Sequence, residues 1–251
     1  MITVGTAPNV RNLLIRNDNT NAAVPVLPAS GMVNLTLNFP NAAITLPAIN
    51  ISGFLDVTSG GDITDSGTLT VSGTVTMNAN AGASNITLDD NGDATYTNSY
   101  GTLELSGATV RVYENAATDF GLSTVDVLEA VNVTGGITDS AVVTINTSGT
   151  FTTQTNDDNI TLANLAGAGW LSVNTAGTAG DATLTHSAAA DLAASTVNGA
   201  LSVSSGAAIS DSGTLTVSGT VTMNANGGAS NITLDDNGDA TYTNSYGTLE
   251  L

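Results

Sequence analysis

Two acidic segments hold the densest group of oxygen ligands in the chain, Asp89-Asp90-Asn91-Gly92-Asp93 and its copy from Asp235 to Asp239. Ca²⁺ takes carboxylate and amide oxygens at alternate positions of a loop. Asp89, Asn91 and Asp93 have that spacing, and so do Asp235, Asn237 and Asp239. The rest of a calcium loop is missing, because the sixth position is Ala94 rather than Gly and the twelfth is Tyr100 rather than Glu. The alternative interpretation is an Asn-Gly turn flanked by solvated acids. The sequence predicts no cofactor other than this possible calcium ion.

Catalytic chemistry has less support. Some β-solenoid enzymes cleave polysaccharides with grouped carboxylates and a basic residue. The one histidine, His186, lies in an alternating segment and is expected to face solvent, and Arg111 is the one basic residue after residue 50. The motifs of nucleophilic hydrolases, phosphate loops and zinc sites are absent from the sequence. We expect no enzymatic activity.

A third group of residues could bind a surface rather than a small molecule. Thr-x-Thr recurs, for example at Thr74-Val75-Thr76 and Thr183-Leu184-Thr185. A flat ladder of threonines presents an ordered array of hydroxyls, but Thr is also a common solvent-facing strand residue. Trp170 and the pairs Tyr96/Tyr100 and Tyr242/Tyr246 could stack on sugars, with packing between coils as the alternative.

A long internal repeat decides the architecture that must position these residues. Forty of the 41 residues from 65 to 105 reappear from 211 to 251, and the one change is Ala81 to Gly227. A weaker middle copy divides the 146-residue offset, because Ile63-Thr64-Asp65-Ser66 returns at 137–140 and again at 209–212. Such a period marks a repeat protein. The units are about 57–130, 131–202 and 203–251, and the incomplete last unit indicates part of a longer array.

Local patterns within the units predict strands. Short runs such as Leu69-Thr70-Val71 alternate apolar and polar residues and are separated by turn formers such as Ser72-Gly73. A unit of about 73 residues divides into three turns of roughly 24, within the size range of solenoid repeats. We therefore predict an all-β fold, a β-solenoid (parallel β-helix) with coils of that length. The alternative is a series of tandem small β-sandwiches.

Composition excludes several functions. There is no lysine or cysteine, only three arginines against 22 acidic residues, and the net charge is −19. Binding nucleic acid or an anionic membrane needs more cations, and disulfide or thiol chemistry needs cysteine. The sequence contains no run of 18 apolar residues, so it predicts no membrane insertion. Aromatic residues make up only 4%, which suits a narrow stacked core.

Residues 1–50 differ from the remainder, because they hold all five prolines and two of the three arginines. Proline removes a ladder donor and is kept to the edges and irregular ends of sheets. We predict an N-terminal cap or assembly segment over 1–50, followed by the repeat region over 51–251.

The segment from Gly61 to Thr76 resembles the repeats of filamentous-haemagglutinin-type exoproteins and the passenger stalks of autotransporter adhesins. The resemblance covers roughly 51–251 and implies an extracellular or cell-surface location. It implies a structural or adhesive role as a segment of a surface fibre or adhesin stalk. The partners expected are the chain itself, as a homopolymer or with neighbouring repeats, and a surface glycan or a host or cell receptor. The alternative is a solenoid that binds ice or surface glycan through a flat Thr/Tyr face.

Overall fold

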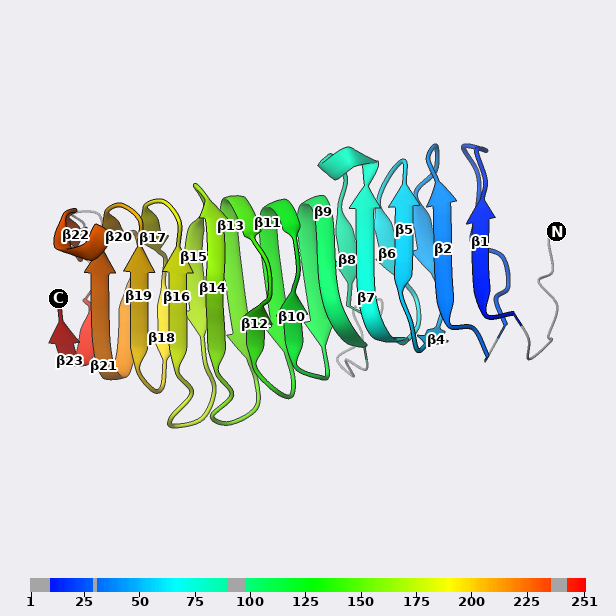
Figure 1. Ribbon diagram of the computed structural model, residues 1–251. Helices are drawn as coiled ribbons and strands as arrows, with labels where there is room; N and C mark the ends of the chain where they lie inside the picture. The colour runs from blue at the N-terminus through cyan, green and yellow to red at the C-terminus, as the bar shows by residue number, and fades with distance from the viewer. Residues whose placement is uncertain (1–9, 29–30, 90–97, 236–242) are drawn as a thin grey trace.

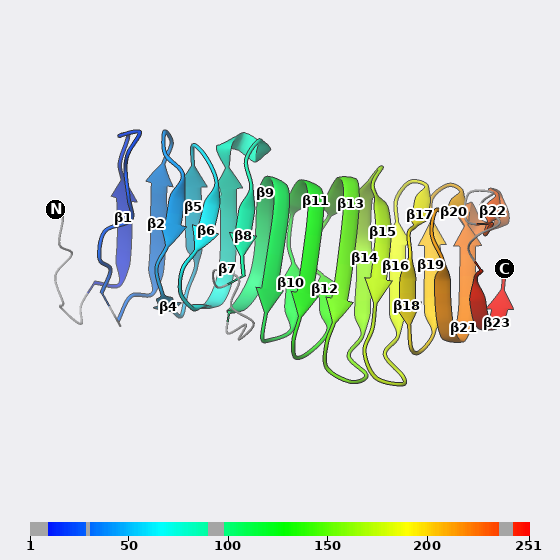
Figure 2. The ribbon, with the colours of Figure 1, turned by 180° about the vertical axis from the view of Figure 1, so that it is seen from behind.

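The computed structural model describes residues 10–28, 31–89, 98–235 and 243–251. Over these residues the chain winds into a rod, a β-solenoid of about 11 turns formed by one parallel sheet. The strands stack along the rod axis, and the first strand, β1 (Asn12–Arg16), and the last, β23 (Ser245–Glu250), lie at opposite ends of the rod (Figures 1 and 2). The predicted all-β solenoid is confirmed.

Three ladders of parallel strands form the walls of the rod. The first ladder runs through β1 (Asn12–Arg16), β2 (Asn34–Phe39), β5 (Leu55–Ser59), β7 (Leu69–Ala79), β9 (Ser99–Glu114), β10 (Thr118–Phe120), β12 (Ile137–Asp139), β14 (Ile160–Gly167), β16 (Ala182–His186), β19 (Leu201–Ser205), β21 (Leu215–Ala225) and β23 (Ser245–Glu250). The second runs through β3 (Ile44–Leu46), β6 (Ile63–Asp65), β8 (Ile86–Leu88), the end of β9, β11 (Ser123–Asn132), β13 (Val143–Thr153), β15 (Trp170–Asn174), β17 (Ala190–Leu192), β20 (Ile209–Asp211) and β22 (Ile232–Thr233). The third includes β4 (Ile49–Ile51) and β18 (Ser195–Val197), which pair with the first parts of β7 and β21.

Alternation along each strand builds the core. In β2, for example, Leu35, Leu37 and Phe39 are fully buried while the residues between them are half-exposed. Because parallel ladders keep neighbouring coils in register, each inward side chain stacks on the inward side chain of the next coil. Leu37 therefore lies over Val57, and Val57 over Met77. The result is one continuous column of mostly aliphatic side chains, which explains why so few aromatic residues are needed.

The 146-residue repeat corresponds to seven coils. β5 and its copy β19 lie on the same ladder, separated by the seven steps β5–β7–β9–β10–β12–β14–β16–β19. The mean coil is therefore about 21 residues long, shorter than the rough value expected from sequence, although single coils vary. Ile44 pairs with Ile63 and Ile86 with Val110, offsets of 19 and 24 residues.

Half of the 146-residue repeat spans three and a half coils. The motif of the middle unit therefore lies on a different wall from the motifs of the other two units. Ile63 and its copy Ile209 both occupy the second ladder, in β6 and β20. The middle copy Ile137, in β12, occupies the first ladder instead. The expected division of each unit into three whole turns is therefore wrong. A whole number of turns would have placed the middle copy on the same wall as the other two.

The regular ladders begin upstream of residue 51. β2, β3 and β4 pair in parallel with β5, β6 and β7, so residues 34–51 already belong to the solenoid. Pro40 and Pro47 lie at corners between strands, where no ladder N–H is required. The irregular N-terminal part is consequently shorter than the 50 residues expected from the distribution of prolines.

Glycine allows β7 and β21 to bend around a corner from one wall to the next. A Cβ on Gly73 would lie 2.7 Å from the carbonyl oxygen of Gly53, and one on Gly219 equally close to that of Gly199. Such contacts are too short, so only glycine permits the close stacking of coils at this corner.

Candidate functional site

The predicted calcium residues lie only partly in the described chain. Asn91, Asp93, Asn237 and Asp239 fall outside it, so the calcium prediction remains a prediction. Asp89 is buried, its N–H donates to Asp65 Oδ1 at 3.1 Å, and its Oδ2 lies 3.9 Å from Nη1 of Arg111. Asp235 is exposed, and its N–H makes the corresponding bond to Asp211 at 2.8 Å.

The carboxylates that the fold uses most heavily are the repeated aspartates Asp65, Asp139 and Asp211. All three are buried at a corner of the coil. Asp139 accepts the N–H groups of Ala163 and Asn164, 24 and 25 residues further along the chain, at 2.6 and 2.8 Å. Each aspartate therefore accepts backbone N–H groups of the next coil at a place where the strand pairing ends or is interrupted.

In the first and third units an asparagine amide, buried at Asn98 and half-buried at Asn244, extends this contact. Asn98 Nδ2 donates to Asp65 Oδ2 at 2.8 Å, and Asn98 Oδ1 accepts the N–H of Leu69 at 2.7 Å. Asn244 makes the same two bonds to Asp211 and Leu215. The repeated Ile-Thr/Ser-Asp-Ser motif was the available signal for these residues, but sequence reasoning used it only to find the repeat.

Arg111 belongs to a polar cluster on the second ladder. Its Nε donates to Glu129 Oε2 at 2.8 Å, and its guanidinium lies 5.7 Å from the ring centre of Tyr113. Tyr113 also donates to Glu129 Oε1 at 3.0 Å. The hydrogen bond to Glu129 raises the pKa of Arg111 further above its ordinary value. The guanidinium of Arg111 is thus held by Glu129, Tyr113 and Asp89.

His186 does not face solvent, which corrects the expectation from sequence. His186 is the last residue of β16, and it is 2% exposed. Its Nδ1 accepts the N–H of Ala188 at 3.1 Å. Burial lowers the pKa of the imidazole. In the coil before the first unit Phe39 occupies the equivalent place, since Phe39 pairs with Ser59 as His186 pairs with Ser205. The histidine replaces a core residue and lines a hollow of about 360 Å³.

The aromatic residues expected on a binding face are separated. Tyr100 is buried and Tyr246 packs against the core, whereas Tyr96 and Tyr242 lie outside the described residues. Trp170 is 39% exposed at the start of β15. Among the described residues, the predicted Thr/Tyr face therefore consists of threonine and serine residues without the tyrosines.

Those hydroxyls form an in-register row on the outside of the first ladder. The row is Thr138, Thr161, Thr183, Ser202 and Thr222, each paired with the next across neighbouring coils. Its members are exposed or half-exposed. Parallel strands place successive hydroxyls about 4.8 Å apart. Acidic residues bound the row, because Asp119 pairs with Thr138 and Glu250 with Thr222.

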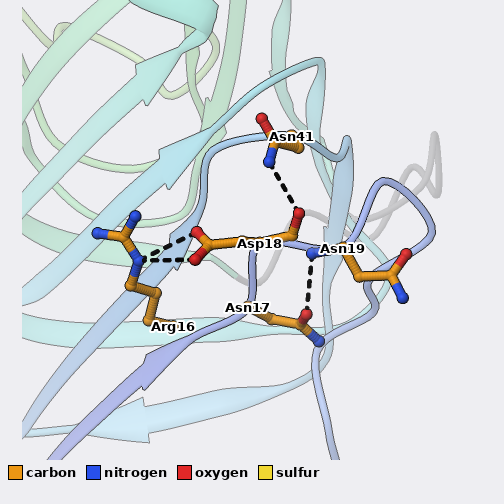
Figure 3. A network of polar contacts seen from close by, with 5 residues as sticks. All are labelled: Arg16, Asn17, Asp18, Asn19 and Asn41. Carbon is orange, nitrogen blue, oxygen red and sulfur yellow. Dashed lines mark hydrogen bonds and ion pairs between the residues drawn. The ribbon is translucent and has the colours of Figure 1, made fainter.

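A small polar network closes the turn after β1 (Figure 3). Arg16 Nε donates to Asp18 Oδ1 at 3.0 Å, and the backbone oxygen of Asp18 accepts from Asn41 Nδ2 at 2.8 Å. The side chain of Asn17 accepts the N–H of Asn19. Both ends of the ion pair are exposed, so it contributes little free energy, but the Asn41 bond ties the first coil to the second.

Potential metal ligands are not gathered in one place among the described residues. No three His, Cys, Asp or Glu side chains among them lie close enough together to hold a metal ion. The helices in this part of the chain are too short or too polar to cross a membrane. The arrangement presents a rigid acidic surface with a row of hydroxyls.

Comparison with known proteins places the chain among repeat proteins. The model of a family described as repeats of unknown function (DUF5649) matches residues 32–102 and 179–246, together more than half of the chain. The chain belongs to this family. No curated protein and no solved structure matches the sequence. The chain is thus a member of a repeat family with a β-solenoid fold.

The two matched segments each contain one of the two repeat motifs that share a wall, at Ile63 and at Ile209. They begin 147 residues apart, which is close to the seven-coil period. The first contains β2 to β8 and the second β16 to β22. The unmatched stretch between them, residues 103–178, contains the repeat motif at Ile137 and most of the middle unit, whose strands are displaced by half a coil.

Sequence reasoning missed one buried acid entirely. Glu114, at the end of β9, is 0% exposed. Its Oε1 accepts the N–H of Tyr100 at 2.7 Å, and its Oε2 has no hydrogen-bond partner among the described residues. Burial raises the pKa of Glu114 to about 8, against the hydrogen bonds from Tyr100 and Thr118, which lower it. Alternation was the available signal, because Glu114 lies two residues after Val112 and therefore on the same face of the strand.

Glu114 should make the stability of the rod depend on pH. Between its ordinary pKa of 4.5 and about 8, the folded chain keeps a proton that the unfolded chain releases. The free energy of unfolding should therefore fall as the pH rises through this window, by at most about 5 kcal/mol in total. Glu114→Gln should remove this slope, measured by urea unfolding at several pH values. The exposed control Glu250→Gln should keep it, and an unchanged slope in Glu114→Gln would show that Glu114 is ionised in the folded rod.

Proposed function

We propose that the chain is a non-catalytic structural segment of an extracellular fibre or adhesin stalk. The continuous parallel ladder carries this proposal, because it makes a stiff rod whose length is set by the number of coils. The buried aspartates at the corners hold neighbouring coils together and are not free to react. The resemblance to filamentous-haemagglutinin-type exoproteins and autotransporter adhesin stalks supports the location and the adhesive role.

The second part of the proposal is association along the rod axis. The segment Ser245–Glu250 of β23 repeats Ser99–Glu104 of β9. In β9 this segment pairs on both sides, with β7 and, through Leu103, with Phe120 of β10. The same sequence is therefore able to accept a further parallel strand, from a neighbouring repeat or from a second copy of the chain.

Charge favours association end to end over side to side. The first 50 residues carry Arg11, Arg16 and a single acid, Asp18, whereas 21 of the 22 acidic residues lie after them. Rods side by side would bring acidic walls together, which is unfavourable. The N-terminal coil instead carries Arg11 and the exposed Arg16–Asp18 ion pair, two arginines against one acid, and can face the acidic part of another molecule.

Electron microscopy of the purified chain at rising concentration tests this proposal. We expect filaments of one rod's width, because end-to-end contacts leave the acidic walls apart. Replacing both Arg11 and Arg16 by Gln should raise the concentration at which filaments form, whereas the matched replacement by Lys, which keeps the charge, should not. Single short rods at every concentration would contradict self-association. Repeating the series with calcium reports on the predicted Asp89–Asp93 and Asp235–Asp239 sites.

A second candidate function is binding of ice or a surface glycan. The row of five hydroxyls from Thr138 to Thr222 favours it, since their regular spacing on a rigid wall suits an ordered ligand. The hydroxyls project from short strands of the wall, where the ladder limits their movement.

Bulky replacements on this row separate the two candidates. Thr161→Tyr with Thr183→Tyr should interrupt the array yet keep the fold, because aromatic residues are well tolerated in strands. A binder should then lose ice-recrystallisation inhibition or retention on a glycan array, while the control Thr150→Tyr on the second ladder keeps it. If the unmodified chain shows neither activity, the second candidate is wrong and the structural proposal is unaffected.

A further inference from the structure

The turn Asn226-Gly227 is the place where the two long copies differ. In the first copy it reads Asn80-Ala81 and in the third Asn226-Gly227, within the short 3₁₀ turns η1 (Asn80–Gly82) and η3 (Asn226–Gly228). The backbone is nearly the same in both, with φ of 53° at Ala81 and 60° at Gly227. This left-handed conformation is strained for alanine and unstrained for glycine. The two turns therefore form a matched pair inside one molecule.

Both turns lie outside the ladders and are open to solvent. Asn226, Gly227 and Gly228 are exposed, and so are Asn80 and Ala81, although β9 packs over the first turn. Asn80 thus stays exposed even with a further strand packed over its turn, and Asn226 is exposed in the same way. Asn226 and Gly227 also line the hollow of about 360 Å³ beside His186.

A second Asn-Gly step in the described chain is held in place. Gly199 N–H donates to the oxygen of Gly180 at 2.9 Å, and Asn198 Nδ2 donates to the backbone oxygen of Thr175. The carboxamide of Asn226, in contrast, makes no hydrogen bond to any described residue. Gly227 is in the first turn of its short helix, where N–H groups have no partner within the helix.

We infer that Asn226 is a site of spontaneous, water-dependent modification that converts it to aspartate and isoaspartate. The backbone nitrogen of Gly227 attacks Cγ of Asn226 and loses its proton as the new C–N bond forms. The Cγ–Nδ2 bond breaks, ammonia leaves, and a five-membered succinimide remains. Water then opens the ring at either carbonyl, which gives aspartate or isoaspartate. No oxidant, metal or enzyme is required.

Glycine determines where this reaction occurs. The attack requires the backbone to move until the nitrogen of the following residue reaches Cγ, and a residue without Cβ permits the widest range of conformations. Ala81 restricts the same movement after Asn80. At Asn198 the hydrogen bond from Gly199 N–H to the oxygen of Gly180 must break before this nitrogen can attack.

The modification adds one negative charge to the turn and leaves the walls intact. β21 ends at Ala225, before the reacting pair, and β22 begins at Ile232. The extra backbone methylene of isoaspartate is therefore accommodated in a turn that contributes no ladder bonds. The site changes the surface charge of the rod with age rather than its fold.

Peptide mass spectrometry of the whole folded chain tests this inference. After incubation in mildly alkaline buffer and digestion with pepsin, the Asn226 peptide should gain the mass that distinguishes a carboxylate from an amide. The Asn80 peptide, recognised by the mass difference between Ala81 and Gly227, and the Asn198 peptide should not. Circular dichroism should stay unchanged.

Two substitutions and one change of conditions sharpen the test. Gly227→Ala should abolish the reaction at Asn226, and Ala81→Gly should create it at Asn80. In denaturant the Asn198 peptide should react as well, since the hydrogen bond from Gly199 to Gly180 is then broken. The inference is overturned if Asn226 stays amidated as long as Asn80 does, or if Asn198 reacts equally fast in the folded chain.

Discussion

The register of the parallel ladders is the constraint on which the rest of the structure depends. Each strand pairs with a strand about 21 residues away, so inward side chains such as Leu37, Val57 and Met77 stack in one column. A shift of one residue would turn every apolar side chain outward. The same register places the hydroxyls of neighbouring coils side by side on the outer wall. Core and surface are thus two consequences of a single pairing pattern.

The corners must satisfy backbone groups that the ladders leave unpaired, and buried aspartates perform this task. Asp65, Asp139 and Asp211 each accept N–H groups from the next coil. Buried carboxylates are tolerated only when they are hydrogen-bonded, which explains why this residue recurs with the repeat. Glu114 differs, because one of its oxygens has no described partner and burial raises its pKa.

The sequence was sufficient to predict the solenoid, because strand alternation and the 146-residue repeat are both visible without a structure. It was insufficient to predict the number of coils in a repeat. Coil length varies with the turns, so a 73-residue unit was assigned three turns when the ladders show three and a half. Burial at His186 and Glu114 was missed although alternation indicates it. His186 lies on the same face as Leu184, and Glu114 on the same face as Val112. The calcium residues Asn91, Asp93, Asn237 and Asp239 remain outside the described chain.

The half-coil displacement of the middle unit is the feature that most clearly separates this rod from a simple three-turn repeat. It results directly from the ladder positions of Ile63, Ile137 and Ile209. It also means that successive units present their turns on alternate walls of the rod. A fibre built from such units would repeat along its axis only after two of them.

Lengthening the chain by one repeat tests this account most directly. Residues 57–202 can be duplicated in tandem, because the sequence after residue 202 is the copy of the one that begins at residue 57. Counting coil layers by cryo-electron microscopy should show seven more layers, a rod longer by about 34 Å. Six additional layers, about 29 Å, or a separate globular body beside the rod would contradict the seven-coil repeat.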